Sequence, residues 1–526
     1  AAAIGSPDPL GPVREISFVL NGTTVVLTDD GCSLLEALRD RLRIRSTKDG
    51  CSPQGQCGCC TVWVDGAPRV ACVTPLSRVR DRAVTTVEGL EGETSASWGD
   101  ALCSTGGSQC GFCTPGIVMR LEATRRTHRG ALSDEQFDQA MLAHLCRCTG
   151  WQTIREAAHA VALGRPSTKP RSRTDAECRA HLEGGTHQQV HRDVALGKIH
   201  FADDSAPADA LVALRGPAGE WVVAETLHEA RRLAGKVQGR RTTEPMRWPV
   251  DLPDGSWDRA LQTTWVEPGY LEPDASWCAP GGDPVSVLPN GGAFGGKVES
   301  AAMRVARNLA DLHGRPVRVL FSREDVVRLG PKRPPLAIGM RRDGSGTVHV
   351  VRTPGIAEAI ARVNSQLTVI EWDVVGPPTS SGIRAAGWAE VAAVNCALGD
   401  QDLVVAPNGA RAAASITREG TVDVDIDAGE VLDEAVLRSY CIGAAHMALG
   451  WVRAEGLVVD AEGEIHDLTM RSFGVLRAVD TPKITVRVVG EHGTARNGSD
   501  AVFAAVAAAA WRAAGHTARW PLSVGK

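Results

Sequence analysis

Eight of the cysteines in the first 150 residues fall into two sets of four, and the first set lies on a glycine-rich loop. Its spacing is Cys-x5-Cys-x2-Cys with a fourth cysteine after eleven more residues, one residue longer in the first gap than the plant-type ferredoxin pattern. Glycines at 50, 55 and 58 let such a loop wrap closely around a cluster and point N–H groups at its sulfides. We therefore expect a [2Fe–2S] cluster here, bound by Cys51, Cys57, Cys60 and Cys72.

Two other uses of these thiols remain open from the residues alone. Zinc sites favour paired Cys-x2-Cys knuckles, and disulfide frameworks are typical of short secreted chains rather than of a chain of 526 residues. Cys59 lies next to a predicted ligand and is interpreted as a spare thiol.

The second set joins a Cys-x2-Cys pair to a tight Cys-x-Cys pair 32 residues further along. Apolar residues at helical spacing predict helices over 117–130 and 133–145 between the pairs, with Ser133 at a helix start. Two loops at the same end of this helix pair would bring the four thiolates together. Taken alone the set could bind zinc; as a second [2Fe–2S] cluster it would be buried among helices and placed for electron transfer. Its members are Cys110, Cys113, Cys146 and Cys148.

Local patterns around the first loop predict a small β-grasp unit. ISFVLNGTTVVLT alternates apolar and polar residues about Asn21–Gly22, and a second strand pair is expected about Asp65–Gly66. SLLEALRDRL (33–42) is an amphipathic helix that Ser33 can cap. Far along the chain, AVFAAVAAAAWRAAG (501–515) is apolar but too short to span a membrane, and we expect a buried helix.

QCGFCTPG (109–116) and CRCTGW (146–151), after the ferredoxin-like loop, resemble the iron–sulfur portion of the molybdenum hydroxylases, the family of xanthine oxidase, aldehyde oxidoreductase and carbon monoxide dehydrogenase. The resemblance runs from about residue 16 to residue 162. It implies a β-grasp domain that holds the first cluster and a four-helix bundle that holds the second, beside a molybdopterin cofactor. It also implies that Cys148 hydrogen-bonds the pterin and that Gln109 approaches it.

The remainder resembles the family's molybdenum subunit in shortened form, in motifs that keep the family order. GGAFGGK (291–297) is similar to a loop that passes close to the metal, which implies cofactor contacts for Gly292, Phe294 and Gly295; a structural glycine turn is the alternative. Arg384 resembles an arginine of the substrate pocket, although a guanidinium beside a carboxylate in an interface is the commoner explanation.

Position 499 departs from the family pattern. The resemblance places the catalytic base, a glutamate, where this chain has Ser499, and a serine hydroxyl is too weak an acid to serve as that base unaided. Asp500 is one residue away and is the possible substitute. We therefore expect no catalytic residue of the usual kind in this chain.

Composition and charge exclude some classes of function. A net charge of −5, from 57 basic and 62 acidic residues, offers no basic footprint for nucleic acid. No apolar run approaches a membrane span, and AAAIGSPDPLGP lacks the regions of a signal peptide, so we expect a cytoplasmic protein.

The expected fold is an α+β multidomain arrangement: a β-grasp domain over 14–90, a helical domain over 91–165, a linker over 166–190, and α/β molybdenum-subunit-like regions over 191–345 and 346–526. The favoured function is an electron-transfer and scaffold subunit in a hetero-oligomer. Its partners would be a full-length molybdenum subunit, which holds most of a molybdopterin cofactor (the cytosine dinucleotide form), and a flavin subunit that carries FAD. A compact hydroxylase with its own cofactor, or a ferredoxin-like carrier with an interaction module, are the alternatives.

Overall fold

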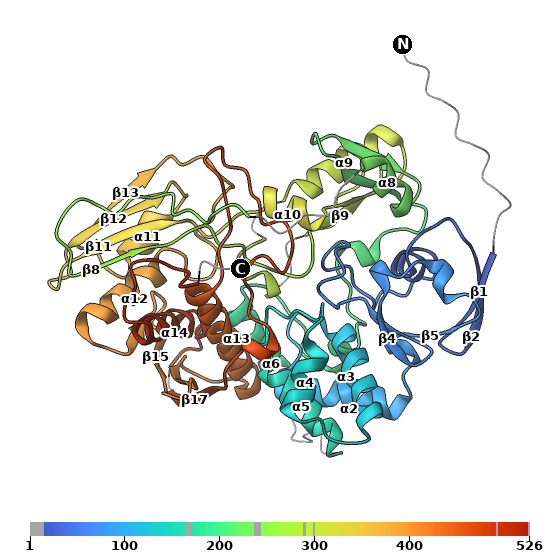
Figure 1. Cartoon of the computed structure of the whole chain (residues 1–526), viewed down its shortest axis with the longest axis horizontal. Coiled ribbons are helices and arrows are strands. Elements are labelled where there is room, and N and C mark those ends of the chain that lie inside the picture. Colours follow the sequence, from blue (N-terminus) through green and yellow to red (C-terminus); the bar gives the residue numbers. More distant parts are fainter. Residues whose placement is uncertain are drawn as a thin grey trace, which may run out of the picture.

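The computed structural model describes residues 15–164, 171–235, 243–287, 291–297, 300–490 and 493–523. Its first unit is a five-stranded sheet in the order β2-β1-β5-β3-β4, at the far right of Figure 1. Both hairpins predicted at Asn21–Gly22 and Asp65–Gly66 are confirmed. The strands are β1 (Glu15–Leu20), β2 (Thr23–Thr28), β3 (Thr61–Val64), β4 (Ala67–Val70) and β5 (Ala83–Thr85).

One helix packs against this sheet. It starts as α1 (Leu34–Glu36) and continues as a π-helical turn over Ala37–Arg41. Ser33 caps it as predicted, since its hydroxyl accepts the amide N–H of Glu36 while the Glu36 carboxylate accepts the amide N–H of Ser33. Leu34, Leu35 and Leu38 are buried, which fixes the following cysteine loop to the β-grasp core.

A helical unit follows, and its elements are α2 (Gly92–Thr105), α3 (Thr114–His128), α4 (Asp134–Met141) and α5 (Gln152–Ala162). The two helices predicted between the cysteine pairs are confirmed as α3 and α4, and Ser133 begins α4 with a capping box to Gln136. The second cysteine set therefore lies at the start of α3 and in the loop between α4 and α5.

The stretch expected as a surface linker contains a helix instead, α6 (Arg173–Gly184). Arg179 and Glu183 have side chains that are 0% exposed and are paired at 3.1 Å. Arg179 donates to the backbone carbonyls of Val431 and Arg496, which are more than 250 residues away in sequence. This part of the chain is thus built into the body of the molecule, while residues 165–170 lie outside the described residues.

The middle of the chain forms a four-stranded sheet in the order β7-β6-β10-β9, with α8 and α9 packed on it. A short helix, α10, follows β10. Bounds are α7 (Arg192–Ala195), β6 (Leu211–Arg215), β7 (Trp221–Ala224), α8 (Leu227–Ala234), β9 (Ala275–Cys278), α9 (Ala301–His313), β10 (Val317–Leu320) and α10 (Arg323–Leu329).

Two further four-stranded sheets have the orders β13-β12-β11-β8 and β14-β15-β16-β17. They lie on the left of Figure 1, where the first runs from yellow-green to light orange and the second is darker orange-brown. Helix α14 confirms the predicted buried helix and packs against α13, α12 and β15. Bounds are β8 (Arg259–Gln262), β11 (Leu336–Met340), β12 (Gly346–Val351), α11 (Ile356–Ala361), β13 (Leu367–Trp372), α12 (Trp388–Gly399), β14 (Leu403–Val405), β15 (Arg411–Ile416), β16 (Val422–Asp427), α13 (Glu434–Arg453), β17 (Ile484–Gly490) and α14 (Ser499–Ala513).

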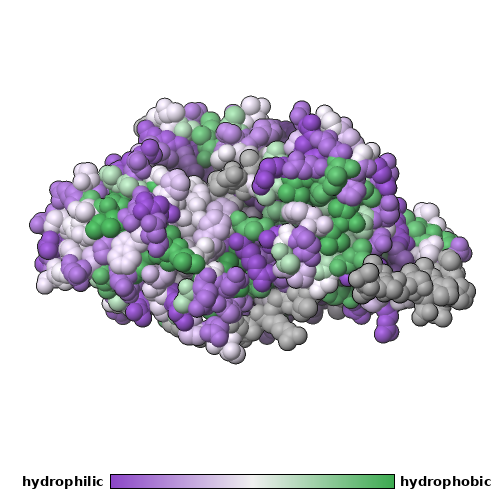
Figure 2. Space-filling view, turned by 90° about the horizontal axis from the view of Figure 1, so that it is seen from above, coloured by the Kyte–Doolittle hydropathy of each residue, from purple (hydrophilic) through white to green (hydrophobic). Residues whose placement is uncertain are grey.

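Seen from above, hydrophilic residues cover much of the surface, and hydrophobic residues gather in one larger area (Figure 2). None of the helices in the described ranges has the length and apolar character needed to cross a membrane.

Candidate iron–sulfur sites and the cofactor region

The thiols of the first cysteine loop lie together and are buried. The Cys51 thiol interacts with the thiols of Cys57 and Cys72, and Cys72 also interacts with Cys60. These neighbouring thiols hold the pKa of Cys51 well below its usual range. The loop turns at Gly55 and Gly58, whose φ angles of 69° and 72° favour glycine.

Backbone amides of this loop point at sulfur. The N–H groups of Gln54 and Gln56 donate to Sγ of Cys51 at 3.2 and 3.5 Å, and the N–H of Cys72 donates to Sγ of Cys60 at 3.4 Å. Such bonds are the usual setting of a [2Fe–2S] cluster and help to determine its reduction potential. The fifth thiol, Cys59, is fully buried, and its Sγ donates to the carbonyl of Cys57 at 3.9 Å.

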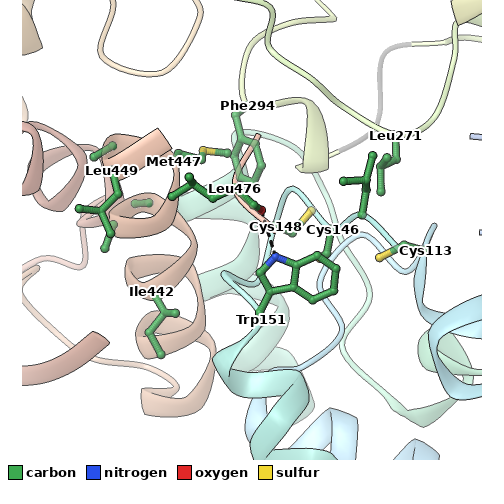
Figure 3. Packing of buried hydrophobic residues seen from close by; sticks show 14 of the residues in the cluster. Cys113, Cys146, Cys148, Trp151, Leu271, Phe294, Ile442, Met447, Leu449 and Leu476 are labelled. Carbon is green, nitrogen blue, oxygen red and sulfur yellow. Dashed lines mark hydrogen bonds between the residues drawn. The ribbon is translucent and has the colours of Figure 1, made fainter. Parts of the chain in front are cut away.

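The second set forms two thiol pairs. Sγ of Cys148 lies 3.6 Å from Sγ of Cys110, and the thiols of Cys113 and Cys146 interact with each other. The Cys113 thiol, with help from the Thr149 hydroxyl at 3.1 Å, lowers the pKa of Cys146 to about 6. Figure 3 shows the sulfur atoms of Cys113, Cys146 and Cys148 beside Trp151.

Within the described ranges, no group of three or more His, Cys, Asp or Glu side chains is arranged to hold a metal ion. A two-iron cluster is larger than one ion and includes its own sulfides. The assignment of the eight cysteines as cluster ligands therefore stays a prediction, supported by thiol proximity and N–H···S bonds.

The two cysteine loops contact each other directly. The amide N–H of Leu145 donates to the carbonyl of Cys57 at 3.0 Å. Gly116, in the first turn of α3, lies against the carbonyls of Gly58 and Cys59, where a Cβ would not fit. His144 fills the space beside Gly58, and burial lowers its pKa to about 3, so the imidazole is neutral.

The C-terminal half covers the second loop. Nε2 of Gln109 donates to the carbonyl of Cys148 at 3.0 Å and to the hydroxyl of Ser439 in α13 at 2.9 Å. Gly443 packs on the Cys148 carbonyl so closely that no side chain could replace it. Arg147, between the two cysteines, makes a buried two-point ion pair with Glu455 at 2.6 and 2.7 Å.

The structure brings the glycine loop, Arg384 and the start of α14 together. Phe294 and Gly295 have φ angles of 47° and 84°, and Gly295 lies against the carbonyl of Gly382. The amide N–H of Arg384 donates to the carbonyl of Phe294 at 3.0 Å, and its guanidinium lies over the Phe294 ring. Gly292 is buried in the same loop; residues 288–290 and 298–299 lie outside the described residues.

Arg384 is engaged by the chain itself. Its Nη2 donates to the Ser499 hydroxyl at 3.0 Å, and its Nε is 3.1 Å from the Asp500 carboxylate. Burial raises the pKa of Asp500, and the Arg384 charge opposes this shift. Ser499 is fully buried.

Sequence reasoning missed one residue here, Glu183. Its carboxylate accepts the amide N–H groups of Gly498, at 3.1 and 3.2 Å, and of Ser499, at 2.9 Å, and burial raises its pKa. The signals for a helix were present, because Ser172 caps α6 and Gly185 ends it. Nothing local to residues 172–185 indicated that this helix reaches position 499. The carboxylate also lines a cavity of about 320 Å³, together with Phe294, Gly295, Lys297, Arg384 and Asp500.

Comparisons with known proteins agree with this geometry. Residues 86–159 match the family model of a [2Fe-2S] binding domain. The alpha subunit of isoquinoline 1-oxidoreductase from Brevundimonas diminuta is 38% identical over 149 residues, which are 28% of this chain and 97% of that protein. The chain belongs to the molybdenum hydroxylase family. Among relatives in that family, aldehyde oxidase 1 from Oryctolagus cuniculus is 40% identical over 160 residues, 28% of this chain but only 12% of its own length.

Solved molybdenum hydroxylases share the fold over nearly the whole chain. The aldehyde oxidoreductase from Desulfovibrio desulfuricans matches with a TM-score of 0.69 at 14% identity, covering 94% of this chain and 97% of its own. The aldehyde oxidoreductase from Desulfovibrio gigas matches with a TM-score of 0.68 at 14% identity. The match covers 97% of this chain and 99% of that enzyme's chain. At this identity the likeness concerns architecture, and it confirms the α+β multidomain fold.

Some residues that resemble cofactor contacts of the family are used internally. Arg384 is held by Asp500 and Ser499. Gln109 donates from Nε2 to Cys148 and Ser439, while its buried Oε1 has no hydrogen-bond partner among the described residues. Lys297, also on the cavity wall, is paired with Glu272 at 2.9 Å. An anionic pterin phosphate would have to displace these partners. Arg384 and Lys297 therefore do not fit the role of principal ligands of a molybdopterin.

Proposed function

We propose that this chain is an electron-transfer and scaffold subunit of a molybdenum-dependent hydroxylase or dehydrogenase complex. Electrons would pass from a molybdopterin site through the cluster at Cys110, Cys113, Cys146 and Cys148 to the cluster at the first loop, and then toward a flavin or another acceptor. The observation that carries the proposal is the direct contact of the two thiol-rich loops through Leu145 and Cys57. A short, packed path of this kind suits transfer between two redox centres.

The chain's own groups would hold the clusters and keep water away. The eight cysteines supply thiolates, and all of them except the partly exposed Cys110 are buried. Amide N–H groups of Gln54, Gln56 and Cys72 stabilise the negative sulfur atoms. Helix α13 closes the outer side of the second loop.

The proposal places most of the molybdopterin, in its cytosine dinucleotide form, on a partner molybdenum subunit and FAD on a separate flavin subunit, in the cytoplasm. The internal pairing of Arg384 and Lys297 supports a partner as the holder of the cofactor. The relative that the chain covers almost fully is itself named as a subunit, which supports a hetero-oligomer.

EPR spectroscopy of the reduced chain tests the cluster assignment. Two distinct [2Fe–2S] signals are expected, and Cys148→Ser should remove or perturb only one of them. Cys178→Ser, which changes an exposed thiol, is the matched control and should leave both signals intact. A single signal, or bound zinc in place of iron, would contradict the assignment.

One observation favours the compact hydroxylase as a second candidate. The cavity of about 320 Å³ is lined by Glu183, Asp500 and Arg384, the last of which resembles an arginine of the family's substrate pocket. Its volume is at the lower end of the range for small-molecule sites. Turnover by the isolated chain, lost in Asp500→Ala with both clusters intact, would establish this candidate.

A further inference from the structure

One segment of the C-terminal half, residues 468–476, contacts both cysteine loops. It lies between α13 and β17, more than 300 residues from either loop in sequence. We call it the strap. Its first part meets the loop of the first cluster, and its last part meets Trp151, which follows the second cysteine set (Figure 3).

The strap binds the first loop through two glutamines. Nε2 of Gln54 donates to the carbonyl of Leu468 at 2.8 Å, and Oε1 of Gln54 accepts the amide N–H of Met470 at 3.1 Å. Oε1 of Gln56 accepts the amide N–H of Arg471 at 3.2 Å. These are the same two residues whose own amide N–H groups donate to Sγ of Cys51. The strap therefore fixes the pieces of backbone that form the N–H···S bonds.

Arg471 ties this contact to the second loop. Its guanidinium donates to the carbonyl of Gln56 from Nε and Nη2, both at 3.3 Å, and from Nη2 to the carbonyl of Leu142 at 2.5 Å. Leu142 ends α4, four residues before Cys146. At the other end of the strap, the carbonyl of Leu476 accepts Nε1–H of Trp151 at 3.3 Å. A fixed positive charge thus lies beside the first loop, on a residue that bridges both.

The contacts of the strap affect the charge balance of the first cluster when it is reduced. One electron, released by the second cluster as it is oxidised, reduces the first cluster and adds one unit of negative charge to it. Hydrogen bonds to its sulfurs and a nearby cation stabilise the reduced form and raise the reduction potential. Both are supplied or held by the strap.

We propose that Arg471 is a positioning residue that, together with Gln54 and Gln56, raises the reduction potential of the first cluster above the value that the ferredoxin-like domain alone would give it. The inference rests on the proposed function, since it requires a cluster at Cys51, Cys57, Cys60 and Cys72. It assigns to the C-terminal half a role in electron transfer that needs no cofactor of its own.

EPR-monitored redox titration of the full chain tests the proposal. Arg471→Ala should weaken the electron affinity of the first cluster about tenfold, which is 59 mV for one electron, and leave the potential of the second cluster unchanged. Arg471→Lys keeps the charge but cannot bridge two carbonyls in the same way, so a smaller shift is expected. Arg487→Ala removes an exposed guanidinium that is paired with Asp425 on a distant sheet, and it should shift neither potential.

Gln54→Glu provides a second, independent variant. It replaces the amide that donates to Leu468 with an anionic oxygen, and it should also lower the potential of the first cluster. Unchanged potentials in Arg471→Ala and Gln54→Glu, with both EPR signals present, would overturn the proposal, as would equal shifts of both clusters. Absence of the two signals in the unmodified chain would instead refute the proposed function.

Discussion

Around the first cysteine loop, backbone N–H groups point at sulfur; around Arg384, the donors point at the chain's own carboxylates. Cys51 receives the amides of Gln54 and Gln56, whereas the amides of Gly498 and Ser499 are taken by Glu183. The first region is arranged to stabilise the charge of a bound group. In the second region, these donors are paired with groups of the chain itself.

The largest effect is expected from removing a predicted ligand in the first cysteine loop. Cys72→Ser should abolish the EPR signal of the first cluster and halve the iron content, because a two-iron cluster needs its four thiolates. Cys59→Ser is the matched control at an equally buried thiol and should retain both signals. Retention of the first signal in Cys72→Ser would show that another residue is the ligand.

Substitutions in the region around Arg384 and the start of α14 should lower the stability of the fold rather than the iron content. Glu183→Ala leaves Arg179 buried without its carboxylate and frees two buried amide N–H groups, so a loss of about 3–5 kcal/mol is expected. Glu183→Gln keeps an acceptor and should cost less. Chemical denaturation followed by tryptophan fluorescence measures both, and equal effects of the two substitutions would speak against the charge pairing.

Asp500→Ala should have the smallest effect. If the catalytic carboxylate belongs to a partner chain, turnover of the assembled complex should stay nearly unchanged, and Ser499→Glu should confer no activity on the isolated chain. Steady-state turnover at equal cluster content checks both. A large loss in Asp500→Ala would identify this carboxylate as the base.

The elements that the sequence predicted well depend on local interactions. The Asn21–Gly22 hairpin, the Ser33 cap and the Ser133 helix start each need only neighbouring residues. The linker prediction failed because the partners of Arg179 and Glu183 come from residues 430–499, and no local pattern reports them. The contacts of the strap could not be predicted for the same reason. Gln54 and Gln56 resemble ordinary loop residues in sequence, and their partners Met470 and Arg471 lie more than 400 residues further along the chain.

Metal analysis of the isolated chain, purified from cells supplied with molybdenum, tests the central claim most directly. Two [2Fe–2S] clusters predict about four iron and four sulfide per chain, because each cluster contains two of each. The internal pairing of Arg384 and Lys297 predicts molybdenum far below one per chain. One tightly bound molybdenum per chain, alongside full iron content, would contradict the account and establish a self-contained hydroxylase.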